Sequence, residues 1–375
     1  MDNTYVIDKE WKYVLQLLPD DLEESALAKL AIRRRRGVDS AENLLRLALA
    51  YAVCDFSLRQ TAAWAKVTGI AELSDVALLK RLRGASDWLG SLVVGWLKER
   101  GLATHVPGIP VRLVDATVLT APEAQGVDWR VHLGLDLDAT RITSLELTDP
   151  EGGETLLRHH VTRGEVVVAD RGYCHREGIA YVLNQGGHVL IRSTWQNLPL
   201  ETIKGDAVGI MSLLSTLQPG EIGDWPVRIR VKNRTYALRL VATRKTQAAT
   251  QRELKRARSE AQRRQRRLDP RTLRAAAFQF VLTDLPREIL PPAEAHELYR
   301  LRWQIEVAFK RLKSILHLDN LRAHDAQLAR SCIYAKLLGA LIIDELSTSA
   351  LAFFPPGFPI ISKPRQSLAL ADPLD

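Results

Sequence analysis

Residues 164–173, GEVVVADRGY, combine the pattern of a buried strand with a charged end. Four consecutive apolar residues, three of them valine, are typical of a strand that is covered on both faces. Asp170 follows this run directly, and Arg171 and Gly172 then indicate a loop. Because strand-end loops often carry functional side chains in α/β folds, Asp170 is a candidate active-site residue.

The segments on either side of this strand predict an α/β layer. Upstream, an apolar and β-branched run is followed by two alternating segments, which together are typical of three antiparallel strands. Downstream, helical and strand patterns alternate, so we expect a mixed central sheet covered by helices. The expected strands are PVRLVDATVL (110–119), WRVHLGLDLD (129–138), RITSLELTD (141–149) and GHVLIRS (187–193), and the expected helices are GGETLLRHHV (152–161) and HREGIAYVLNQ (175–185).

An all-helical N-terminal DNA-binding domain is expected over residues 1–105, because apolar residues recur there at three- and four-residue spacing. Inside it, residues 57–84 combine a helix, a short turn and a second, basic helix, which is the order of a helix-turn-helix motif. Any helical bundle can produce the same pattern, so DNA contact and simple packing both remain open. The signals are a capping box of Ser57 with Gln60, a stop at Gly69, a cap at Ser74 and basic side chains at Lys80, Arg81 and Arg83.

Residues 193–285 interrupt the α/β alternation and are rich in strand signals. The segment GDWPVRIRVKNRTYALRLVATR (223–244) predicts a hairpin with Asn233 and Arg234 at its turn. Residues 244–274 then hold twelve Lys or Arg against three acids. A solvated helical face is one explanation for such a run, but the excess of positive charge favours a helix that contacts DNA phosphates. The candidate contact residues are Arg263, Arg264, Arg266 and Arg267.

The composition favours a polyanionic partner. The 375-residue chain has a formal net charge of +8, and arginine, which binds phosphate in a planar bidentate geometry, outnumbers lysine. The three cysteines form no CxxC pattern, so neither a zinc site nor a disulfide framework is expected. The N-terminus is polar, and the apolar stretch 337–354 contains Asp344 and Glu345. We therefore expect no signal peptide, no membrane span and a cytoplasmic location.

Two acids lie in apolar strand patterns, Asp115 in RLVDATVL and Asp170 in VVVADRGY. A buried carboxylate costs free energy unless it is paired, hydrogen-bonded or bound to a cation. With Glu306 from a later segment, they make a candidate carboxylate triad without His or Cys neighbours, which is the donor set of a hard cation such as Mg²⁺ or Mn²⁺. Two such ions activate a water and stabilise the leaving oxygen in phosphodiester cleavage. Taken alone, Asp115 is also explained as a turn or cap residue after a strand.

Glu306 lies in a stretch with a specific spacing, YRLRWQIEVAFKRLK (299–313). Read as one helix, it places Tyr299 two turns before Glu306, Arg302 one turn before it and Lys313 two turns after it. The pattern is Y-x2-R-x3-E-x6-K, and two strand aspartates precede it, the second in a DRGY context. Together these features resemble the DDE transposases of bacterial insertion sequences, in particular insertion sequence family 4.

The resemblance covers residues 110–345 and implies a fold, an activity and a set of site residues. The fold would be a ribonuclease-H-like mixed-sheet catalytic domain (106–192 and 286–350), interrupted by a β-rich insertion (193–285) and followed by a tail (351–375). The activity would be a DNA transposase that binds the terminal inverted repeats of its element, cleaves them and joins the 3′ ends to target DNA. It would act as a homodimer in the DNA complex, on the bacterial nucleoid.

The resemblance also assigns roles to the residues quoted above. Asp115, Asp170 and Glu306 would be the catalytic residues and the ligands of two Mg²⁺ or Mn²⁺ ions. Tyr299, Arg302, Trp303 and Lys313 would contact DNA, with core packing as the alternative for Trp303. On this interpretation, Arg302 and Lys313 act on DNA phosphates and contribute little to stability.

One position departs from the family pattern. The family carries a tryptophan in the insertion, shortly before a strand end, that probes a flipped base, whereas FQFVLTDLP (278–286) has Gln279 there. Phe278 and Phe280 flank it, but the alternation makes both of them core candidates. Trp225 is another aromatic residue of the insertion that is a possible substitute. The sequence therefore does not predict base flipping.

Three functions remain open at this point. The first is an active transposase, the second is a nuclease or resolvase on the same ribonuclease-H-like fold that hydrolyses without strand transfer, and the third is an inactive DNA-binding relative. Hydrolysis and transesterification use the same ions, so the acid triad does not separate the first two. The intact triad disfavours the third, since a binding module has no need of buried acids that face a phosphate.

Overall fold

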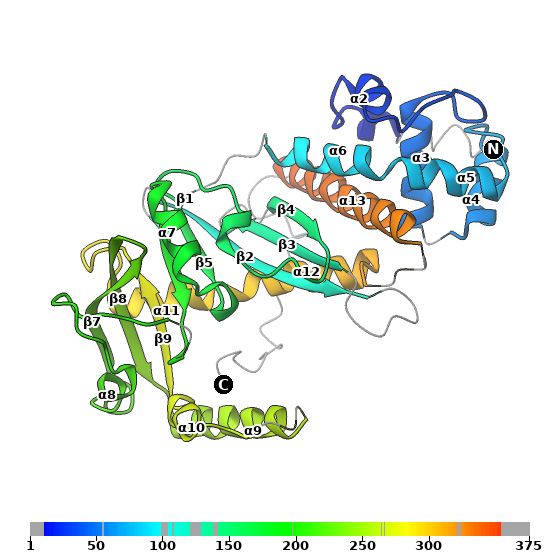
Figure 1. Cartoon of the computed structure of the whole chain (residues 1–375). Coiled ribbons are helices and arrows are strands. Elements are labelled where there is room, and N and C mark those ends of the chain that lie inside the picture. Colours follow the sequence, from blue (N-terminus) through cyan, green and yellow to red (C-terminus); the bar gives the residue numbers. More distant parts are fainter. Residues whose placement is uncertain are drawn as a thin grey trace.

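The computed structural model of the chain describes residues 11–54, 56–98, 104–106, 109–120, 129–137, 142–196, 198–263, 265, 267–319, 321, 323 and 325–353. Figure 1 shows a lobe of helices beside a larger part that is built on one twisted sheet. Two of the expected DNA contacts, Arg264 and Arg266, lie outside the described residues, as does the expected tail beyond Phe353.

The sheet has nine strands in the order β4-β3-β2-β5-β6-β9-β8-β7, with β1 paired to β2. The pairs β2/β5 and β5/β6 are parallel and the remaining pairs are antiparallel, so the expected α/β class with a mixed sheet is confirmed. The strands are β1 (Thr104–Val106), β2 (Ile109–Leu119), β3 (Trp129–Asp136), β4 (Ile142–Thr148), β5 (Val166–Ala169), β6 (His188–Arg192), β7 (Ile222–Val231), β8 (Arg234–Arg244) and β9 (Phe278–Thr283).

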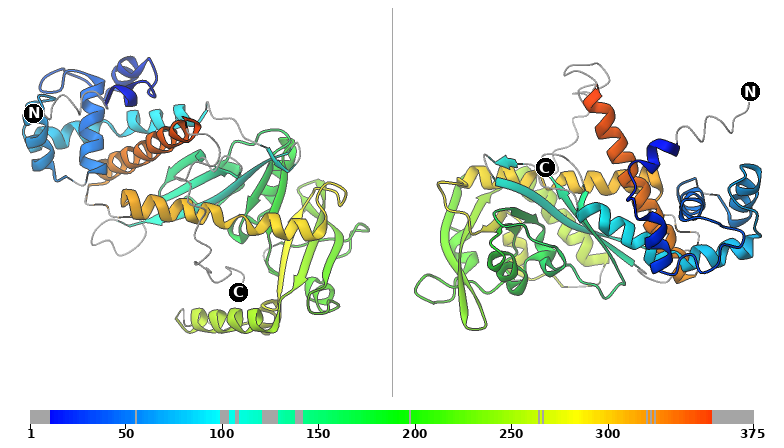
Figure 2. Two further views of the ribbon diagram at one scale, coloured as in Figure 1. Left: turned by 180° about the vertical axis from the view of Figure 1, so that it is seen from behind. Right: turned by 90° about the horizontal axis from the view of Figure 1, so that it is seen from above.

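Helices cover both faces of this sheet. The rear and top views in Figure 2 show α11 and α12 on one face and α7 on the other, which makes three layers. The helix expected over 152–161 is only one 3-10 turn, η1, because Thr155 caps it at one end and His159 is already extended at the other. The elements are η1 (Leu156–Arg158), η2 (Arg171–Tyr173), α7 (Arg176–Asn184), α11 (Pro292–Arg300) and α12 (Trp303–Leu316).

Side chains of β5 alternate between two hydrophobic cores. Val166 and Val168 belong to the core that contains residues of α12, whereas Val167 and Ala169 belong to the core that contains residues of α7. This is the two-residue period of a strand. Burial on both faces explains why the sequence of β5 is continuously apolar.

The insertion extends the central sheet. β9 pairs with β6 and β8 pairs with β9, so three strands of residues 193–285 continue the sheet of the α/β part. The expected hairpin forms from β7 and β8, but its turn lies at Lys232 and Asn233, one residue earlier than expected. Lys232 has a left-handed φ of 51° there. The insertion also contains α8 (Ile210–Leu214), α9 (Gln247–Arg263) and α10 (Pro270–Ala275), and Figure 1 shows α9 standing away from the sheet.

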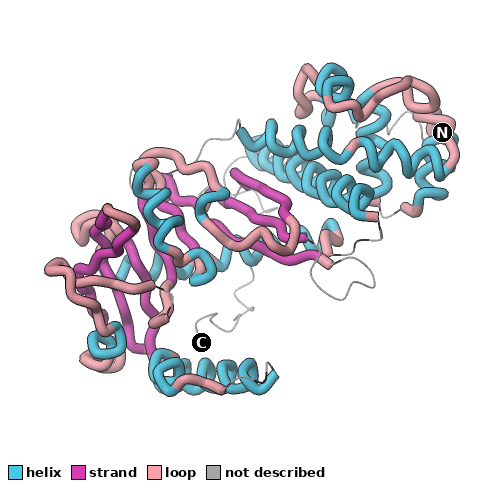
Figure 3. The backbone as a smooth tube through the Cα atoms, in the orientation of Figure 1, coloured by secondary structure: helices cyan, strands magenta, loops and turns pink. Residues whose placement is uncertain are grey.

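The described residues between 11 and 98 form helices joined by turns and loops, without a strand, as expected, and Figure 3 shows helices and loops there. The capping box of Ser57 and Gln60 is present, with each side chain accepting a hydrogen bond from the backbone N–H of the other residue (2.9 and 3.2 Å). The helices are α2 (Leu22–Ala28), α3 (Ala41–Val53), α4 (Leu58–Val67), α5 (Asp75–Gly84) and α6 (Ser86–Lys98).

The last helix, α13 (Ala326–Phe353), packs mainly against this lobe, on α3, α5 and α6. Glycines allow close contact, since a Cβ added to Gly90 would lie 3.1 Å from the Tyr334 ring and one added to Gly339 would lie 3.0 Å from Val53. By length and composition α13 is the one helix among the described residues that could cross a membrane, but 72% of its most apolar window is buried inside the fold. Such burial is typical of the core helix of a globular protein.

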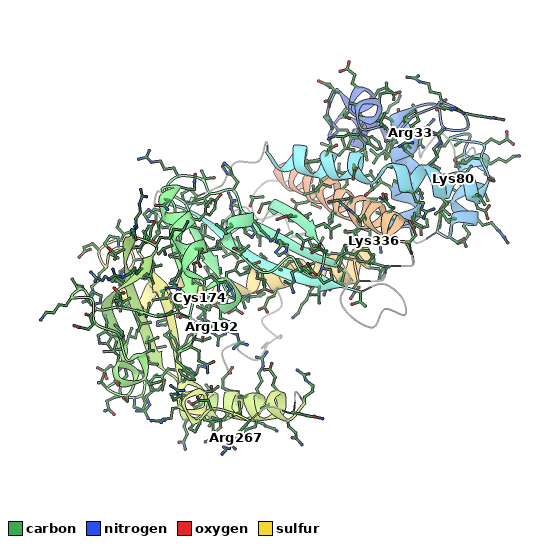
Figure 4. The ribbon with its side chains drawn as sticks, in the orientation of Figure 1. Arg33, Lys80, Cys174, Arg192, Arg267 and Lys336 are labelled. Atoms are coloured by element: carbon green, nitrogen blue, oxygen red, sulfur yellow. The ribbon has the colours of Figure 1, made fainter. Side chains whose placement is uncertain are left out.

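The helix-turn-helix candidate consists of α4 and α5, and two of the three basic side chains expected on its second helix have protein partners. Arg81 donates to the carbonyl oxygens of Arg34 and Arg36, and Arg83 Nε donates to Asp325 Oδ1 at 2.8 Å. Lys80 is exposed on α5, where Figure 4 labels it. The packing interpretation therefore accounts for Arg81 and Arg83.

Candidate functional site

Asp115 and Asp170 occupy equivalent positions on neighbouring parallel strands. The β2/β5 register ends at Val114 opposite Ala169, and each aspartate is the next residue of its chain. Val114 and Ala169 both belong to the core on the α7 side. Alternation therefore turns both aspartates toward the opposite face, where α11 and α12 lie. Two acids that are far apart in the sequence thus lie side by side.

The stretch 299–313, expected as one helix, forms two. α11 ends at Arg300 and α12 begins at Trp303, and between them Leu301 N bonds to Leu298 O and Arg302 N to Tyr299 O. These are the i→i+3 hydrogen bonds of a 3-10 turn. In such a turn each residue advances by about 120° around the helix axis, whereas in an α-helix it advances by about 100°. Tyr299 and Arg302 are therefore rotated relative to the single face that a continuous helix predicts.

Arg302 connects the acid of β2 to the acid of α12. Its Nη1 donates to Asp115 Oδ2 at 3.2 Å, and its Nη2 donates to Glu306 Oε1. The Arg302 side chain is 14% exposed and that of Asp115 20%, so their ion pair is largely shielded from water, whereas Glu306 is 48% exposed. The guanidinium is thereby held in one orientation between the two carboxylates.

Tyr299 and Arg192 contact Asp170. The Tyr299 hydroxyl donates to Asp170 Oδ1 at 3.1 Å, and Arg192 Nη1 lies 3.9 Å from the same oxygen. Tyr299 is 5% exposed, so its hydroxyl orients the carboxylate from inside the protein. Arg192, which was not predicted from the sequence, ends β6 beside β5, the strand that Asp170 follows, and Figure 4 labels it near Cys174. A basic residue at the end of the next predicted strand was the available signal.

The two aspartates differ in acidity. Burial raises the pKa of Asp115 to about 6, and nearby carboxylates add to this effect while Arg302 opposes it. Burial acts on Asp170 in the same direction, but Arg302, a backbone N–H group, Arg192 and Tyr299 outweigh it and hold the pKa of Asp170 below its usual value. Like charges that approach each other in a partly buried site favour a bound cation.

The donor set of the site fits a hard divalent cation, because the groups around Asp115 and Asp170 offer carboxylate oxygens without a His or Cys ligand. Glu306 is connected to this pair through Arg302. Within the described part of the chain, no three His, Cys, Asp or Glu side chains lie close enough to share one ion. Glu306 can therefore join an ion at the aspartates only if Arg302 releases it.

A cleft of about 460 Å³ extends from these residues to the basic helix α9. On the α9 side, Glu253, Arg256, Ala257 and Glu260 line it, and their spacing places them on one face of the helix. Both acids of α9 thus point into the cleft, while basic residues such as Lys255 are exposed on other faces. On the other side the cleft is lined by Asp170, Arg171, Arg192, Lys245, Gln279, Tyr299, Arg300, Arg302, Trp303 and Glu306.

The remaining expected DNA contacts take different positions. Trp303 lines the cleft, and Arg263 and Arg267 are exposed at and beyond the end of α9; Figure 4 labels Arg267 beside that helix. Lys313 is half-buried on α12, two turns beyond Glu306, and is not among the described residues that line the cleft. The expected row of donors along one helix face is therefore divided between the interior and the cleft.

Gln279 reaches the cleft from β9. It is 6% exposed, and its Nε2 has no hydrogen-bond partner within the described residues. Phe278 and Phe280 are buried in the core on the α7 side, as the alternation predicted. Trp225 lies on β7, half-buried against that same core and not among the described residues of the cleft wall.

Comparison with known proteins identifies the family. The family model described as "Transposase DDE domain" matches residues 107–342. The chain is 38% identical over 354 residues to the InsL protein of insertion sequence element IS186A of Escherichia coli (strain K12), covering 92% of this chain and 96% of that one. It is 38% identical over 355 residues to the transposase for insertion sequence element IS421 of Escherichia coli, with the same coverage.

More distant proteins match as well. The transposase for insertion sequence element IS231F of Bacillus thuringiensis subsp. israelensis is 24% identical over 263 residues, covering 62% of this chain and 55% of that one. Among solved structures, the cryo-EM structure of the piggyBac transposase synaptic complex with hairpin DNA matches with a TM-score of 0.47 and 8% identity, covering 90% of this chain and 74% of that one. The family model and the two Escherichia coli relatives extend over the elements that hold Asp115, Asp170 and Glu306, and the chain belongs to the DDE transposases.

Proposed function

We propose that this DDE transposase cleaves the ends of its own insertion sequence and joins the exposed 3′ ends to target DNA, using a ribonuclease-H-like catalytic domain. The observation that carries the proposal is the placement of Asp115 beside Asp170, with Glu306 connected to them by Arg302. Asp170, Arg302 and Glu306 line a cleft whose far wall belongs to α9, a helix with an excess of basic residues. Phosphodiester chemistry needs this combination of acids and cations.

Asp115, Asp170 and Glu306 would hold two Mg²⁺ or Mn²⁺ ions. When bound, such ions supply Lewis-acid activation of the attacking oxygen and stabilise the leaving oxygen. The protein supplies orientation, since Tyr299 holds the Asp170 carboxylate through a 3.1 Å hydrogen bond. Arg302, once it exchanges Glu306 for a DNA phosphate, would clamp the backbone with its guanidinium fork. Trp303 lines the same cleft and is placed to stack on a base there.

The substrates would be double-stranded DNA, namely the terminal inverted repeats of the element and the target. The exposed basic residues of α9 and the segment after it, including Arg263 and Arg267, support a phosphate-tracking role outside the cleft. We further propose a homodimer in the DNA complex, acting on the nucleoid in the cytoplasm. The division into an N-terminal domain (1–105), two catalytic segments (106–192 and 286–350) and an insertion (193–285) belongs to the same proposal.

The test is an assay of cleavage and strand transfer with purified protein. A labelled duplex that carries one element end is incubated with a supercoiled target plasmid, with Mg²⁺ or with a chelator. We expect Mg²⁺-dependent nicking at the element end and a labelled joint product, and Asp115→Asn should abolish both while band-shift binding of the duplex stays within about twofold. Asp149→Asn, an exposed change, is the matched control.

The outcomes separate the functions that the sequence left open. Nicking without a joint product would mean a nuclease or resolvase. Binding without nicking by the unaltered protein would mean an inactive DNA-binding relative. Equal loss of binding and nicking in Asp115→Asn would mean that the residue is structural, and the proposed active site would be wrong.

A further inference from the structure

The cleft at the acid site continues into a second cavity, of about 570 Å³, on the side of the insertion. The two cavities share part of their walls, and the residues that line both are Arg171, Arg192, Lys245, Glu253, Ala257 and Gln279. Three of these six residues are cations and one is an acid, so the junction between the cavities has an excess of positive charge. Such a junction attracts an anion.

The register of the sheet places three of these residues on one face. Arg192 of β6 pairs with Val281 of β9, so it shares a face with Gln279, which lies two residues earlier on β9. Thr243 of β8 pairs with Gln279, so Lys245, two residues further along the chain, lies on this face as well. A guanidinium, an amide and an ammonium group thus lie on three neighbouring strands at the junction.

This row of donors begins at the acid site and extends away from it. Arg192 Nη1 lies 3.9 Å from Asp170 Oδ1, on the strand next to the one that Asp170 follows. Neighbouring strands are about 4.8 Å apart, so Gln279 and Lys245, two and three strands from β5, lie about 10 Å and about 14 Å from that strand. A ligand of Gln279 and Lys245 is therefore a different group from one that is held at the aspartates.

Two of the three donors lack a partner within the described part of the chain. Lys245 is half-buried, and its ammonium group makes no hydrogen bond or ion pair with another described residue. Burial lowers the pKa of Lys245, with Glu253 opposing and Arg192 adding to this effect. Gln279 is 6% exposed, and its Nε2 has no hydrogen-bond partner among the described residues. Unpaired donors at a shielded site cost free energy, so they indicate an acceptor that binds there.

We propose that Arg192, Gln279 and Lys245 bind a backbone phosphate of the DNA in the cleft, separate from the phosphate that is cleaved. The inference rests on the proposed function, because it assumes that DNA occupies the cleft. A phosphate has enough acceptor oxygens to bond to all three groups, and its charge strengthens each bond. Glu253 of α9 is the one acid at the junction, and its carboxylate repels this phosphate.

The first experiment measures binding of the full-length protein to a duplex that carries the element end, in a chelating buffer. Lys245→Gln should weaken binding by about 10-fold or more, the scale of a hydrogen bond to a charged group. The slope of log K against log salt should fall by about 0.9. Glu253→Gln should bind the duplex more tightly. Lys232→Gln, which removes the same charge at the exposed turn between β7 and β8, is the control and should change neither quantity.

The second experiment locates the phosphate. A set of duplexes, each with one uncharged methylphosphonate near the cleavage position, is bound by the unaltered protein and by Lys245→Gln. At one position other than the cleaved one, the substitution should weaken binding of the unaltered protein and cause no further loss in Lys245→Gln. At every other position the two proteins should lose affinity equally.

Gln279→Leu separates a role in binding from a role in folding. It should remove part of the affinity, and it should reduce the effect of the methylphosphonate at the same position as Lys245→Gln does. Its Tm should be unchanged or higher, because leucine leaves no unpaired donor. A lower Tm with equal effects at every position would mean that Gln279 is structural and would overturn the proposal.

The failure of this inference is distinguishable from failure of the proposed function. If the unaltered protein binds and cleaves the element end, but no position depends on Lys245, only the phosphate site is wrong. If the unaltered protein neither binds nor cleaves the element end, the proposed function is wrong, and the phosphate site falls with it.

Discussion

Arg302 places a positive charge among the acids of the site. Its Nη1 donates to Asp115 and its Nη2 to Glu306, so binding a DNA phosphate with both nitrogens would require it to release Glu306. The spacing of Arg302 and Glu306 predicted that they would meet, since they are four residues apart. The bond to Asp115 was not predictable, because it depends on which strand of the sheet lies under the start of α12.

Arg302→Ala should therefore destabilise the protein in the absence of metal, contrary to the expectation from sequence that its Tm would stay the same. Removing one partner of a largely buried ion pair costs about 3–5 kcal/mol, and the 14% exposure of Arg302 places it near the lower end of that range. Differential scanning calorimetry in a chelating buffer measures the loss, and saturating Mn²⁺ should restore part of it. Cleavage should fall by about 10²-fold or more, the scale for one preorganised charge-stabilising donor.

The matched variant is Arg302→Lys, which keeps the charge and loses the fork. It should recover much of the stability and little of the cleavage. If Arg302→Ala melted at the same temperature as the unaltered protein in the chelating buffer, the ion pairs of Arg302 would contribute no measurable stability. The role of Arg302 would then be limited to DNA.

Asp115→Asn should raise the free energy of unfolding at pH 8 in the absence of metal. The pKa of Asp115 is raised to about 6 in the folded protein, from a usual value of 3.8. The folded state therefore binds a proton at Asp115 more tightly than the unfolded state does. The stability that this proton binding contributes is fully present below about pH 3.8 and is lost as the pH rises through about 6. Asparagine does not ionise, so the variant should be more stable by about 1–2 kcal/mol at pH 8.

Urea unfolding as a function of pH checks this sign. The advantage of Asp115→Asn should shrink as the pH falls and should disappear near pH 4. Addition of Mn²⁺ should stabilise the unaltered protein and not the variant, because the ion binds to the ionised carboxylate, which asparagine lacks. If Asp115→Asn were less stable than the unaltered protein at every pH, the raised pKa of Asp115 in the folded protein would be wrong.

At the scale of elements, local patterns predicted most of the strands and helices that surround the candidate site. The apolar runs of β2, β5 and β6, the helix α7 and the capping box of α4 follow from strand period, helix period and cap chemistry. Three features depend on contacts that no local pattern encodes. These are the break between α11 and α12, the joining of the insertion strands to the central sheet through β6 and β9, and the side of α9 that faces the cleft.

The orientation of α9 sharpens the prediction for its charges. Neutralising the exposed Arg263 and Arg267 to Gln should weaken binding to every DNA sequence and lower the slope of log K against log salt by about 0.9 for each lost phosphate contact. Filter binding over a range of potassium chloride concentrations measures both quantities. Arg234→Gln, an exposed change at the far hairpin, is the control and should leave the slope unchanged. If the slope were also unchanged in the double variant, Arg263 and Arg267 would make no phosphate contact and would be solvated surface residues.

At the scale of the whole molecule, α13 joins the two parts of the chain. Lys336, in the middle of α13, is 1% exposed and donates to the carbonyl oxygen of His317, the residue that caps α12, and Figure 4 labels it. Ser331 donates to the carbonyl oxygen of Leu82 in the helical lobe at 2.6 Å. The helix that follows the Glu306 helix is thus built into the N-terminal lobe and also contacts the end of the Glu306 helix.

This packing predicts that residues 1–105, expected from sequence to form a domain, will not fold independently. The lobe shares its hydrophobic core with Ile333, Leu337 and Leu338 of α13, each at most 1% exposed, and a fragment without them exposes that surface to water. Burial of each such side chain contributes about 1.5–3 kcal/mol, so the three together reach the scale of a whole domain's stability, about 5–15 kcal/mol. We expect the fragment 1–105 to give poorly dispersed amide resonances and no cooperative melting. A single chain that joins 1–105 to 325–353 through a glycine-serine linker should recover both, and the same chain with Leu338→Asp should not. A fragment 1–105 that melts cooperatively alone would show that the lobe is a separate domain and that α13 merely docks on it.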